Sequence, residues 1–482
     1  MSVVPRSRWV MRGLLLFVLA FANLHDVWSP DVIPNALLPF TLVRSGDMNY
    51  DEFVTPGTGF ILGTGAADLI DREAYFFRAC GASTATEPPR APRSRGGPPA
   101  PGPNDHVCSV FPPGMGLLAI PLFLPFVLVG ANALDLGLLI RVGHVAAASY
   151  EVLATLLLWA VFRRFASERW ALALVLLYFL GTSVRTVSSQ ALWQHAGVHL
   201  ALAVALWLVL VERPLSSRRA LAAGLALGLG SVVRQTTAIA SPFLGAGRAG
   251  ETVRLLAGTA LGALPLLAFD ALVLGDPFEQ GYGAKPFDAG SVSGALGLLV
   301  SPSRGLLVYE PFVAFAFASL ALLAPRRSLV ERRLAALPLA WAAAFVLYAA
   351  YAEWWGGRVF GPRFLDDQAP LLFALLAWGA GRGLLARAWA RALFWISAAW
   401  SLLIFNAAAL VYDQSWDTVP VNVNDDPSRL FSWTDPQWLA VLRDVPSGGL
   451  RVAVAIALSL VALAFLARVE GLIGRRVVAS AR

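Results

Sequence analysis

Long apolar runs, separated by short polar segments, recur along almost the whole chain. A helix that spans a bilayer needs about 20 largely apolar residues, so this pattern is typical of a protein that crosses a membrane many times. It predicts an all-α polytopic membrane protein. We expect about twelve spans, near residues 13–28, 140–162, 170–187, 197–212, 219–233, 236–247, 254–274, 308–324, 334–352, 369–382, 391–411 and 450–467.

The first apolar run follows three arginines, Arg6, Arg8 and Arg12. A signal peptide begins in the same way, but it ends in a small-residue cleavage site, and none follows here. We therefore expect an uncleaved first helix whose N-terminus lies in the cytoplasm. Residues 29–113 then form a long polar loop on the outer, periplasmic or extracellular side.

Clusters of arginine between the spans set the orientation, because arginine is retained on the cytoplasmic side. The clusters are Arg163, Arg164 and Arg169; Arg213, Arg218 and Arg219; Arg248 and Arg254; Arg326, Arg327, Arg332 and Arg333; Arg382, Arg387 and Arg391; and Arg468, Arg475 and Arg476. Placing all of them inside requires residues 114–130 to form an interfacial or re-entrant helix, which Pro121 and Pro125 favour. Both termini are then cytoplasmic. If residues 114–130 cross the membrane instead, Arg163 and Arg164 fall outside.

The composition excludes the other broad classes of protein. Of the 482 residues, 57% are apolar and 14% are charged. A soluble enzyme of this size needs more polar residues to cover its surface, and a disordered chain has fewer large apolar residues. The net charge of +7 comes from scattered arginines that form no basic stripe, so we expect no nucleic-acid partner. Residues 1–482 are expected to form one domain in contact with membrane lipids.

The same orientation gathers polar segments on the outer side, where any chemistry is expected. They are residues 29–113, 188–195, 275–307, 353–368 and 412–448. Within the first loop, residues 82–105 are rich in Pro, Gly, Ser and Arg, which indicates a flexible insert. The only two cysteines, Cys80 and Cys108, flank this insert. In an oxidising compartment they would form a disulfide, and two free thiols are the alternative.

Asp31 directly follows the first span. A carboxylate is costly in hydrocarbon, so it should lie at the water boundary or face a cavity. Alternatively, Asp31 caps a helix that begins at Val32, since aspartate is a favoured N-cap. Asp51 and Glu52 form a second acidic pair about twenty residues on, for which a solvated surface pair is the alternative.

Short motifs follow one another in an order that a known family shares. They are Asp31 after the first span, Ser109-Val110-Phe111-Pro112-Pro113-Gly114, Leu192-Trp193-Gln194-His195, Ser301-Pro302-Ser303-Arg304-Gly305-Leu306, Trp354-Trp355-Gly356-Gly357 and Gly361-Pro362-Arg363-Phe364-Leu365. Together they resemble bacterial GT-C fold glycosyltransferases, nearest the family 39-like group with protein mannosyltransferases and aminoarabinose transferases. The resemblance implies a GT-C-like bundle with interfacial helices in its long first outer loop.

The resemblance also implies a reaction. Such enzymes pass a sugar from a polyprenyl-phosphate carrier to a lipid, glycan or protein acceptor at the outer face of the bacterial plasma membrane, usually with inversion. Asp31 matches the family's general base. Asp51 and Glu52 are the competing candidates, and they would otherwise orient the acceptor or bind a cation. Some members use a divalent metal, but this chain has no tight D-x-D motif after its first span, so no metal cofactor is predicted.

The leaving phosphate needs cations, and guanidinium matches phosphate through paired donors. The candidates are Arg234, Arg304, Arg358 and Arg363. Arg234 interrupts an apolar hairpin, where the alternative is a structural salt bridge to a loop carboxylate. The other three lie in outer Gly-rich segments, where an interfacial anchor is the alternative.

Three further residues are candidates for contacts with the substrates. His195, at the outer end of a span, would contact the acceptor or another ligand, and an ordinary helix-end histidine is the alternative. Trp354 and Trp355 would stack on a sugar, although tryptophans are also common at membrane interfaces.

A secondary transporter or flippase is the rival function. Transporters commonly show two similar halves, and the long first loop has no counterpart near residue 260. No P-loop and no His/Cys zinc spacing is present. A polymerase or ligase of surface glycans would share the same chemistry and differ in its acceptor.

Overall fold

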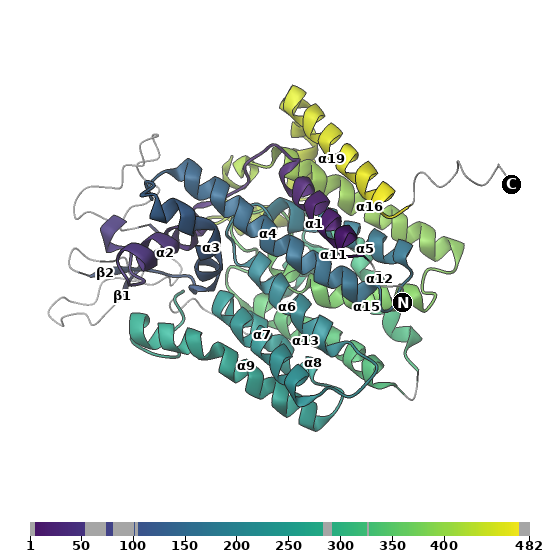
Figure 1. Ribbon diagram of the computed structural model, residues 1–482. Helices are drawn as coiled ribbons and strands as arrows, with labels where there is room; N and C mark the ends of the chain where they lie inside the picture. The colour runs from purple at the N-terminus through teal and green to yellow at the C-terminus, as the bar shows by residue number, and fades with distance from the viewer. Residues whose placement is uncertain are drawn as a thin grey trace.

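The computed structural model describes residues 5–53, 74–80, 101, 105–282, 292–324 and 327–471. Within these residues, the regular elements are helices and one sheet of two strands (Figure 1). The predicted all-α class is therefore confirmed. The insert expected at residues 82–105 lies outside the described residues, apart from Pro101 and Asp105.

The helices follow the predicted apolar runs, and every predicted span overlaps at least one of them. They are α1 (Arg6–Phe21), α2 (Ile33–Arg44), α3 (Gly114–Leu128), α4 (Leu136–Phe162), α5 (Glu168–Leu180), α6 (His195–Val209), α7 (Ser217–Val233), α8 (Ser241–Leu244), α9 (Ala249–Phe269), α10 (Val292–Val300), α11 (Leu306–Tyr309), α12 (Ala314–Ala318), α13 (Leu329–Ala350), α14 (Arg363–Asp366), α15 (Ala369–Gly381), α16 (Ala388–Val411), α17 (Ser415–Thr418), α18 (Gln437–Asp444) and α19 (Gly449–Val469). Short 3₁₀ helices include η1 (Pro30–Val32), η2 (Asp51–Phe53), η5 (Gln235–Ala240) and η9 (Pro427–Phe431). The strands are β1 (Phe77–Cys80) and β2 (His106–Ser109).

Several of these helices suit a membrane. In the described part of the chain, five helical segments are long and apolar enough to span a bilayer, and four shorter helices of 10–17 residues are also apolar. The protein is therefore a multi-pass membrane protein. Residues Gly114–Leu128 do form a helix, and its interfacial or re-entrant placement remains a prediction.

Buried arginines form ion pairs with glutamates at several helix ends on one side of the bundle. The buried Arg12 of α1 pairs with Glu168, at the start of α5, at 2.7 Å and with Glu470, just beyond α19, at 2.6 Å. Arg333, near the start of α13, pairs with Glu251 at the start of α9 at 2.7 Å. The beginning of α1 and the end of α19 thus lie on one arginine-rich face, and the two helices lie side by side in Figure 1.

Close packing of α7 on α9 fixes the position of the broken hairpin. A Cβ on Gly228 of α7 would overlap the carbonyl oxygen of Thr259 in α9, so only glycine allows the two backbones to approach this closely. The helix α7 ends at Val233, and Arg234 follows directly.

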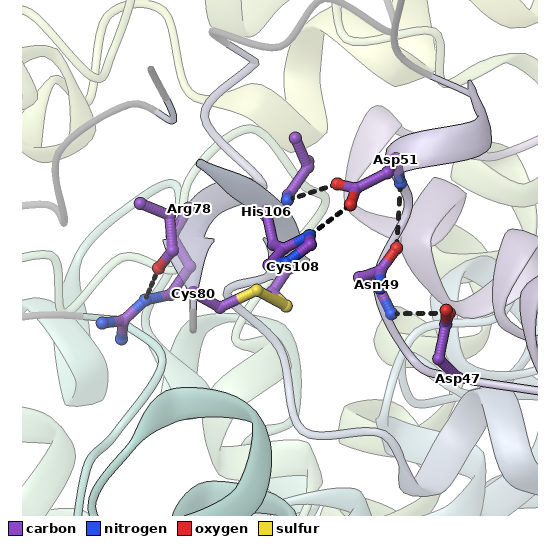
Figure 2. The surroundings of a disulfide bond; sticks show 9 residues. Asp47, Asn49, Asp51, Arg78, Cys80, His106 and Cys108 are labelled. Carbon is purple, nitrogen blue, oxygen red and sulfur yellow. Dashed lines mark hydrogen bonds and ion pairs between the residues drawn. A yellow bond between two sulfur atoms is a disulfide. The ribbon is translucent and has the colours of Figure 1, made fainter. Parts of the chain in front are cut away.

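A strand pair in the segment that follows the first predicted span lies with α2 at the left of Figure 1. The strands β1 and β2 are antiparallel, and a disulfide joins Cys80 to Cys108 (Figure 2). Asp51 accepts a hydrogen bond from the backbone N–H of Val107 at 2.8 Å and contacts His106. The disulfide therefore fixes this part of the loop covalently, and the Asp51 carboxylate binds the backbone of β2.

Candidate active site

A cavity of about 640 Å³ lies among the polar segments that were expected on the outer side. Five of the predicted site residues line it: Asp31, His195, Arg234, Arg358 and Arg363. The other lining residues come from separate stretches of the chain: Ser29, Pro30, Asn35, Tyr75, Val110, Phe111, Trp193, Gln194, Gln235, Thr236, Gln280, Tyr282, Leu347, Tyr348, Tyr351, Glu353, Gly356, Gly357, Phe364, Gln414, Asn422, Asn424 and Asp425. The fold thus brings together residues that are far apart in the sequence.

Asp31 turns its carboxylate toward other side chains of the cavity. It lies in η1, where the hydroxyl of Ser29 accepts the Asp31 backbone N–H at 3.3 Å and so acts as the cap. The alternative that Asp31 caps the helix beginning at Val32 is wrong, because Val32 is the N-cap of α2 and no side chain caps that helix. Its carboxylate accepts a hydrogen bond from Tyr75 and lies 3.7 Å from Nη1 of Arg363. The Asp31 side chain is 20% exposed, so water or a ligand can reach it.

Arg234 enters the cavity wall because the helix breaks at this residue. Its backbone is extended, with φ −155° and ψ 120°, between α7 and η5. Nη1 of Arg234 lies 2.9 Å from Oδ2 of Asp367, and its guanidinium lies 4.9 Å from the ring centre of Phe364. The salt bridge that was the alternative for Arg234 is thus present, and Arg234 lines the cavity as well.

Asp367 is a residue that the sequence analysis missed. It is fully buried between α14 and α15, and its Oδ1 lies 2.6 Å from Nδ1 of His195. Burial alone would raise the pKa of this carboxyl, but the Arg234 guanidinium and His195 hold it well below its usual range. Asp367 therefore stays anionic and fixes two side chains of the cavity wall. The available signal was an acidic pair, Asp366-Asp367, just before an apolar helix in an outer segment.

The Gly-rich loop before α14 brings two more arginines to the cavity. Gly356 and Gly357 have φ of +74° and +78°, which other residues rarely adopt. A Cβ on Gly356 would come within 3.0 Å of Nε of Arg363. The glycines therefore let the loop lie against Arg363, and Arg358 follows them in the cavity wall.

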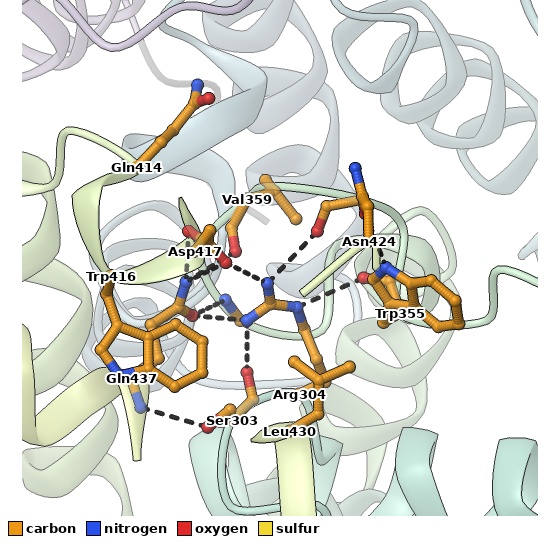
Figure 3. Close-up of polar contacts among 12 residues, drawn as sticks. Ser303, Arg304, Trp355, Val359, Gln414, Trp416, Asp417, Asn424, Leu430 and Gln437 are labelled. Carbon is orange, nitrogen blue, oxygen red and sulfur yellow. Dashed lines mark hydrogen bonds and ion pairs between the residues drawn. The ribbon is translucent and has the colours of Figure 1, made fainter. Parts of the chain in front are cut away.

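Arg304 does not lie at the cavity, so the phosphate role expected of it is wrong. Its side chain is 1% exposed and pairs with Asp417 at 2.6 Å (Figure 3). It also donates to Oε1 of Gln437 at 2.7 Å and to the carbonyls of Trp355 at 3.3 Å and Gly357 at 3.2 Å. Protein groups thus occupy this guanidinium, and its hydrogen bonds to Trp355 and Gly357 stabilise the Gly-rich loop.

The two tryptophans of this loop are also buried and are not among the residues that line the cavity. The Trp354 ring fills the space over Gly297, where a Cβ would overlap it. Trp355 donates from Nε1 to Oδ1 of Asn424 at 3.0 Å. Stacking on a sugar therefore does not fit either position, and both tryptophans pack the loop.

The second acidic pair lies at the strand pair and not at the cavity. Asp51 holds β2 as described above, and Glu52 accepts a hydrogen bond from the hydroxyl of Ser45 at 3.1 Å. Both carboxylates therefore have protein partners, and neither position requires a contact with a substrate. The segment before β1 does reach the cavity, through Tyr75.

No cluster of three or more His, Cys, Asp and Glu side chains suited to a metal ion is present in the described part of the chain. The wall of the cavity carries three arginines and His195, three carboxylates (Asp31, Glu353 and Asp425), and uncharged polar side chains. This set can hold an anion and can accept a proton beside it.

No family model matches the chain, and no curated protein matches it. A solved structure similar to it is the crystal structure of ArnT from Cupriavidus metallidurans bound to undecaprenyl phosphate. The two chains are 12% identical, the match covers 96% of this chain and 77% of ArnT, and the TM-score is 0.44.

Proposed function

We propose that the protein is a membrane glycosyltransferase that passes a sugar from a polyprenyl-phosphate donor to an acceptor hydroxyl. The observation that carries this proposal is that Asp31 lines the same cavity as Arg234, Arg358 and Arg363. A carboxylate beside several guanidiniums suits a reaction in which one end of the site accepts a proton and the other binds a leaving phosphate.

In this reaction Asp31 is the general base. The acceptor oxygen attacks the anomeric carbon while Asp31 takes the proton of the hydroxyl group. The bond between that carbon and the phosphate oxygen breaks, and the polyprenyl phosphate leaves with the electron pair. Attack opposite to the leaving group gives inversion at the anomeric carbon.

The three arginines stabilise the phosphate as its charge increases. Guanidinium is always charged and offers paired donors to phosphate oxygens. Asp367 holds Arg234 at 2.9 Å, so this side chain is oriented before a ligand arrives. The arginines supply the positive charge that other enzymes obtain from a divalent metal, and we therefore propose a reaction without a metal cofactor.

The arginine-rich face lies in the cytoplasm, and the cavity opens on the other side, at the outer face of the bacterial plasma membrane. The rule that arginine is retained inside supports this orientation. The acceptor is a lipid, glycan or protein of the cell envelope. The residues that line the cavity come from outer segments and helix ends, which favours a site at one face over the path that a transporter or flippase needs.

Comparing the cell envelope of a strain that carries the gene with that of a strain lacking it tests the proposal. We expect one envelope lipid or glycan to lose the mass of a sugar residue in the deletion strain and to regain it on complementation. Mass spectrometry of extracted lipids and glycans measures this difference. Identical envelopes in the two strains would contradict the proposal.

A further inference from the structure

One part of the cavity wall consists of uncharged amide side chains. Gln414, Asn422 and Asn424 all line the cavity and are half-buried. They lie between α16 and η9, in an outer segment for which the sequence offered no role. We call these three residues the amide wall. Each amide group can donate and accept hydrogen bonds, as the hydroxyl groups of a sugar can.

The amide wall contacts the segment that carries Asp31 and also the Gly-rich loop that carries Arg358. Nε2 of Gln414 donates to the backbone carbonyl of Trp28 at 2.9 Å, three residues before Asp31. Oδ1 of Asn424 accepts from Nε1 of Trp355 at 3.0 Å, next to the Gly-rich loop that carries Arg358. A ligand on this wall would therefore lie between the proposed base and one of the proposed phosphate ligands.

Each amide is anchored through one atom and keeps another for a ligand. Oδ1 of Asn422 accepts the backbone N–H of Asn424 at 3.0 Å. Among the described residues, nothing bonds the side-chain nitrogens of Asn422 and Asn424 or the side-chain oxygen of Gln414. The protein thus fixes these groups without using all of their hydrogen-bonding capacity.

Gln194 gives an independent indication of a polar ligand. This cavity residue is only 7% exposed, and its Nε2 is buried without a hydrogen-bond partner in the described part of the chain. Its Oε1 is held by the hydroxyl of Tyr282 at 3.4 Å. Buried donors are nearly always bonded, so an unpartnered one in a cavity wall indicates a ligand that supplies an acceptor.

We propose that the amide wall, together with Gln194, is a subsite for an uncharged sugar ring. The inference rests on the proposed function in assigning the neighbouring arginines to the phosphate. Neutral amides recognise hydroxyl groups and offer nothing specific to a lipid tail. The ring belongs either to the donor or to a glycan acceptor, and both present the same hydroxyl groups to the wall.

Saturation-transfer NMR on the full-length protein in lipid nanodiscs tests the subsite. The probes are the methyl glycosides of glucose, galactose and mannose, with decyl phosphate as a separate probe of the arginines. We expect at least one glycoside to bind the unaltered protein, and Asn422→Leu/Asn424→Leu to reduce its signal about fivefold, as the loss of a hydrogen bond does. The control is Asn132→Leu, an exposed asparagine outside the cavity, which should bind as the unaltered protein does.

Decyl phosphate shows whether the double variant is folded, because its binding should be unchanged. Equal glycoside signals in the double variant and the unaltered protein would overturn the subsite, as would the absence of any glycoside signal in a protein that binds decyl phosphate. If an excess of hexose 1-phosphate displaces the glycoside, the subsite belongs to the donor sugar. If both bind together, it belongs to the acceptor. Glycoside binding with unchanged cell envelopes in the deletion strain would contradict the proposed function and leave the subsite standing.

Discussion

A single buried carboxylate, Asp367, orients two side chains of the cavity wall. It lies 2.9 Å from Nη1 of Arg234 and 2.6 Å from Nδ1 of His195. Neither contact could be derived from one sequence, because the partners lie far apart in the chain and no local pattern links them. Asp31 and Arg234 were predictable because a charged residue beside an apolar span is costly and needs an explanation.

The variant Asp367→Asn tests this orienting role. Removing one partner of a buried ion pair leaves the other charge uncompensated, which costs about 3–5 kcal/mol. We expect a lower melting temperature and weaker binding of decyl phosphate, measured on the purified protein. Asp413→Asn, at an exposed aspartate of the outer segment, is the matched control. A variant as stable as the control, with unchanged phosphate binding, would show that Asp367 does not hold Arg234.

Arg304 shows where the sequence analysis failed. The motif identified the residue type and the segment, but a motif does not give the depth of a side chain, and the guanidinium is buried in contact with Asp417 and Gln437. The same holds for Trp354 and Trp355, whose burial depends on packing against distant residues. Residue type and segment were thus predictable, while orientation toward the cavity was not.

The position of Arg304 predicts a defect in stability. In Arg304→Gln the carboxylate of Asp417 loses its cation, so we expect a destabilisation of about 3–5 kcal/mol, seen as a lower melting temperature. Arg358→Gln, in the cavity wall, should weaken decyl phosphate binding and leave the melting temperature nearly unchanged. If Arg304→Gln instead lowers phosphate binding at full stability, Arg304 contacts the phosphate after all.

At the scale of elements, the strand pair supports the cavity through Tyr75. This residue precedes β1 and donates to the carboxylate of Asp31. Arg78 of β1 adds a link to the segment that carries Tyr282, through an ion pair with Glu279 at 2.9 Å. The disulfide between Cys80 and Cys108 holds β1 to β2.

Removing the disulfide tests this support. In Cys80→Ser/Cys108→Ser we expect a loss of about 2–4 kcal/mol of stability and a lower rate of sugar transfer, because Tyr75 is no longer held against Asp31. Melting curves and transfer assays on the purified protein measure the two effects. A reductant should lower the stability and the transfer rate of the unaltered protein, and it should change those of the double variant very little. An unchanged rate of sugar transfer in the double variant would show that the strand pair does not support the active site.

At the scale of the whole molecule, the fold class was predictable because long apolar windows reflect the thickness of the bilayer directly. The structure adds that the start of α1 and the end of α19 share one arginine-rich face, through the contacts of Arg12 with Glu168 and Glu470. The cavity could not be located from the sequence, because it is assembled from many separate segments.

Labelling single cysteines in intact cells tests the orientation. In a background without the two native cysteines, Ser428→Cys lies in the outer segment 412–448, and Arg387→Cys lies just before α16 on the arginine-rich side; both positions are exposed. We expect a membrane-impermeant maleimide to label position 428 in intact cells and position 387 only after permeabilisation. The reverse pattern would place the cavity in the cytoplasm.

The most direct test of the central claim is sugar transfer by Asp31→Asn. The purified protein in nanodiscs is supplied with donor lipids and acceptors extracted from the deletion strain, and the glycosylated product is measured by mass spectrometry. Because a general base contributes about 10²–10⁴-fold to the rate, we predict a loss of at least about 100-fold, with unchanged melting temperature and decyl phosphate binding. Transfer by Asp31→Asn at the full rate would contradict the account.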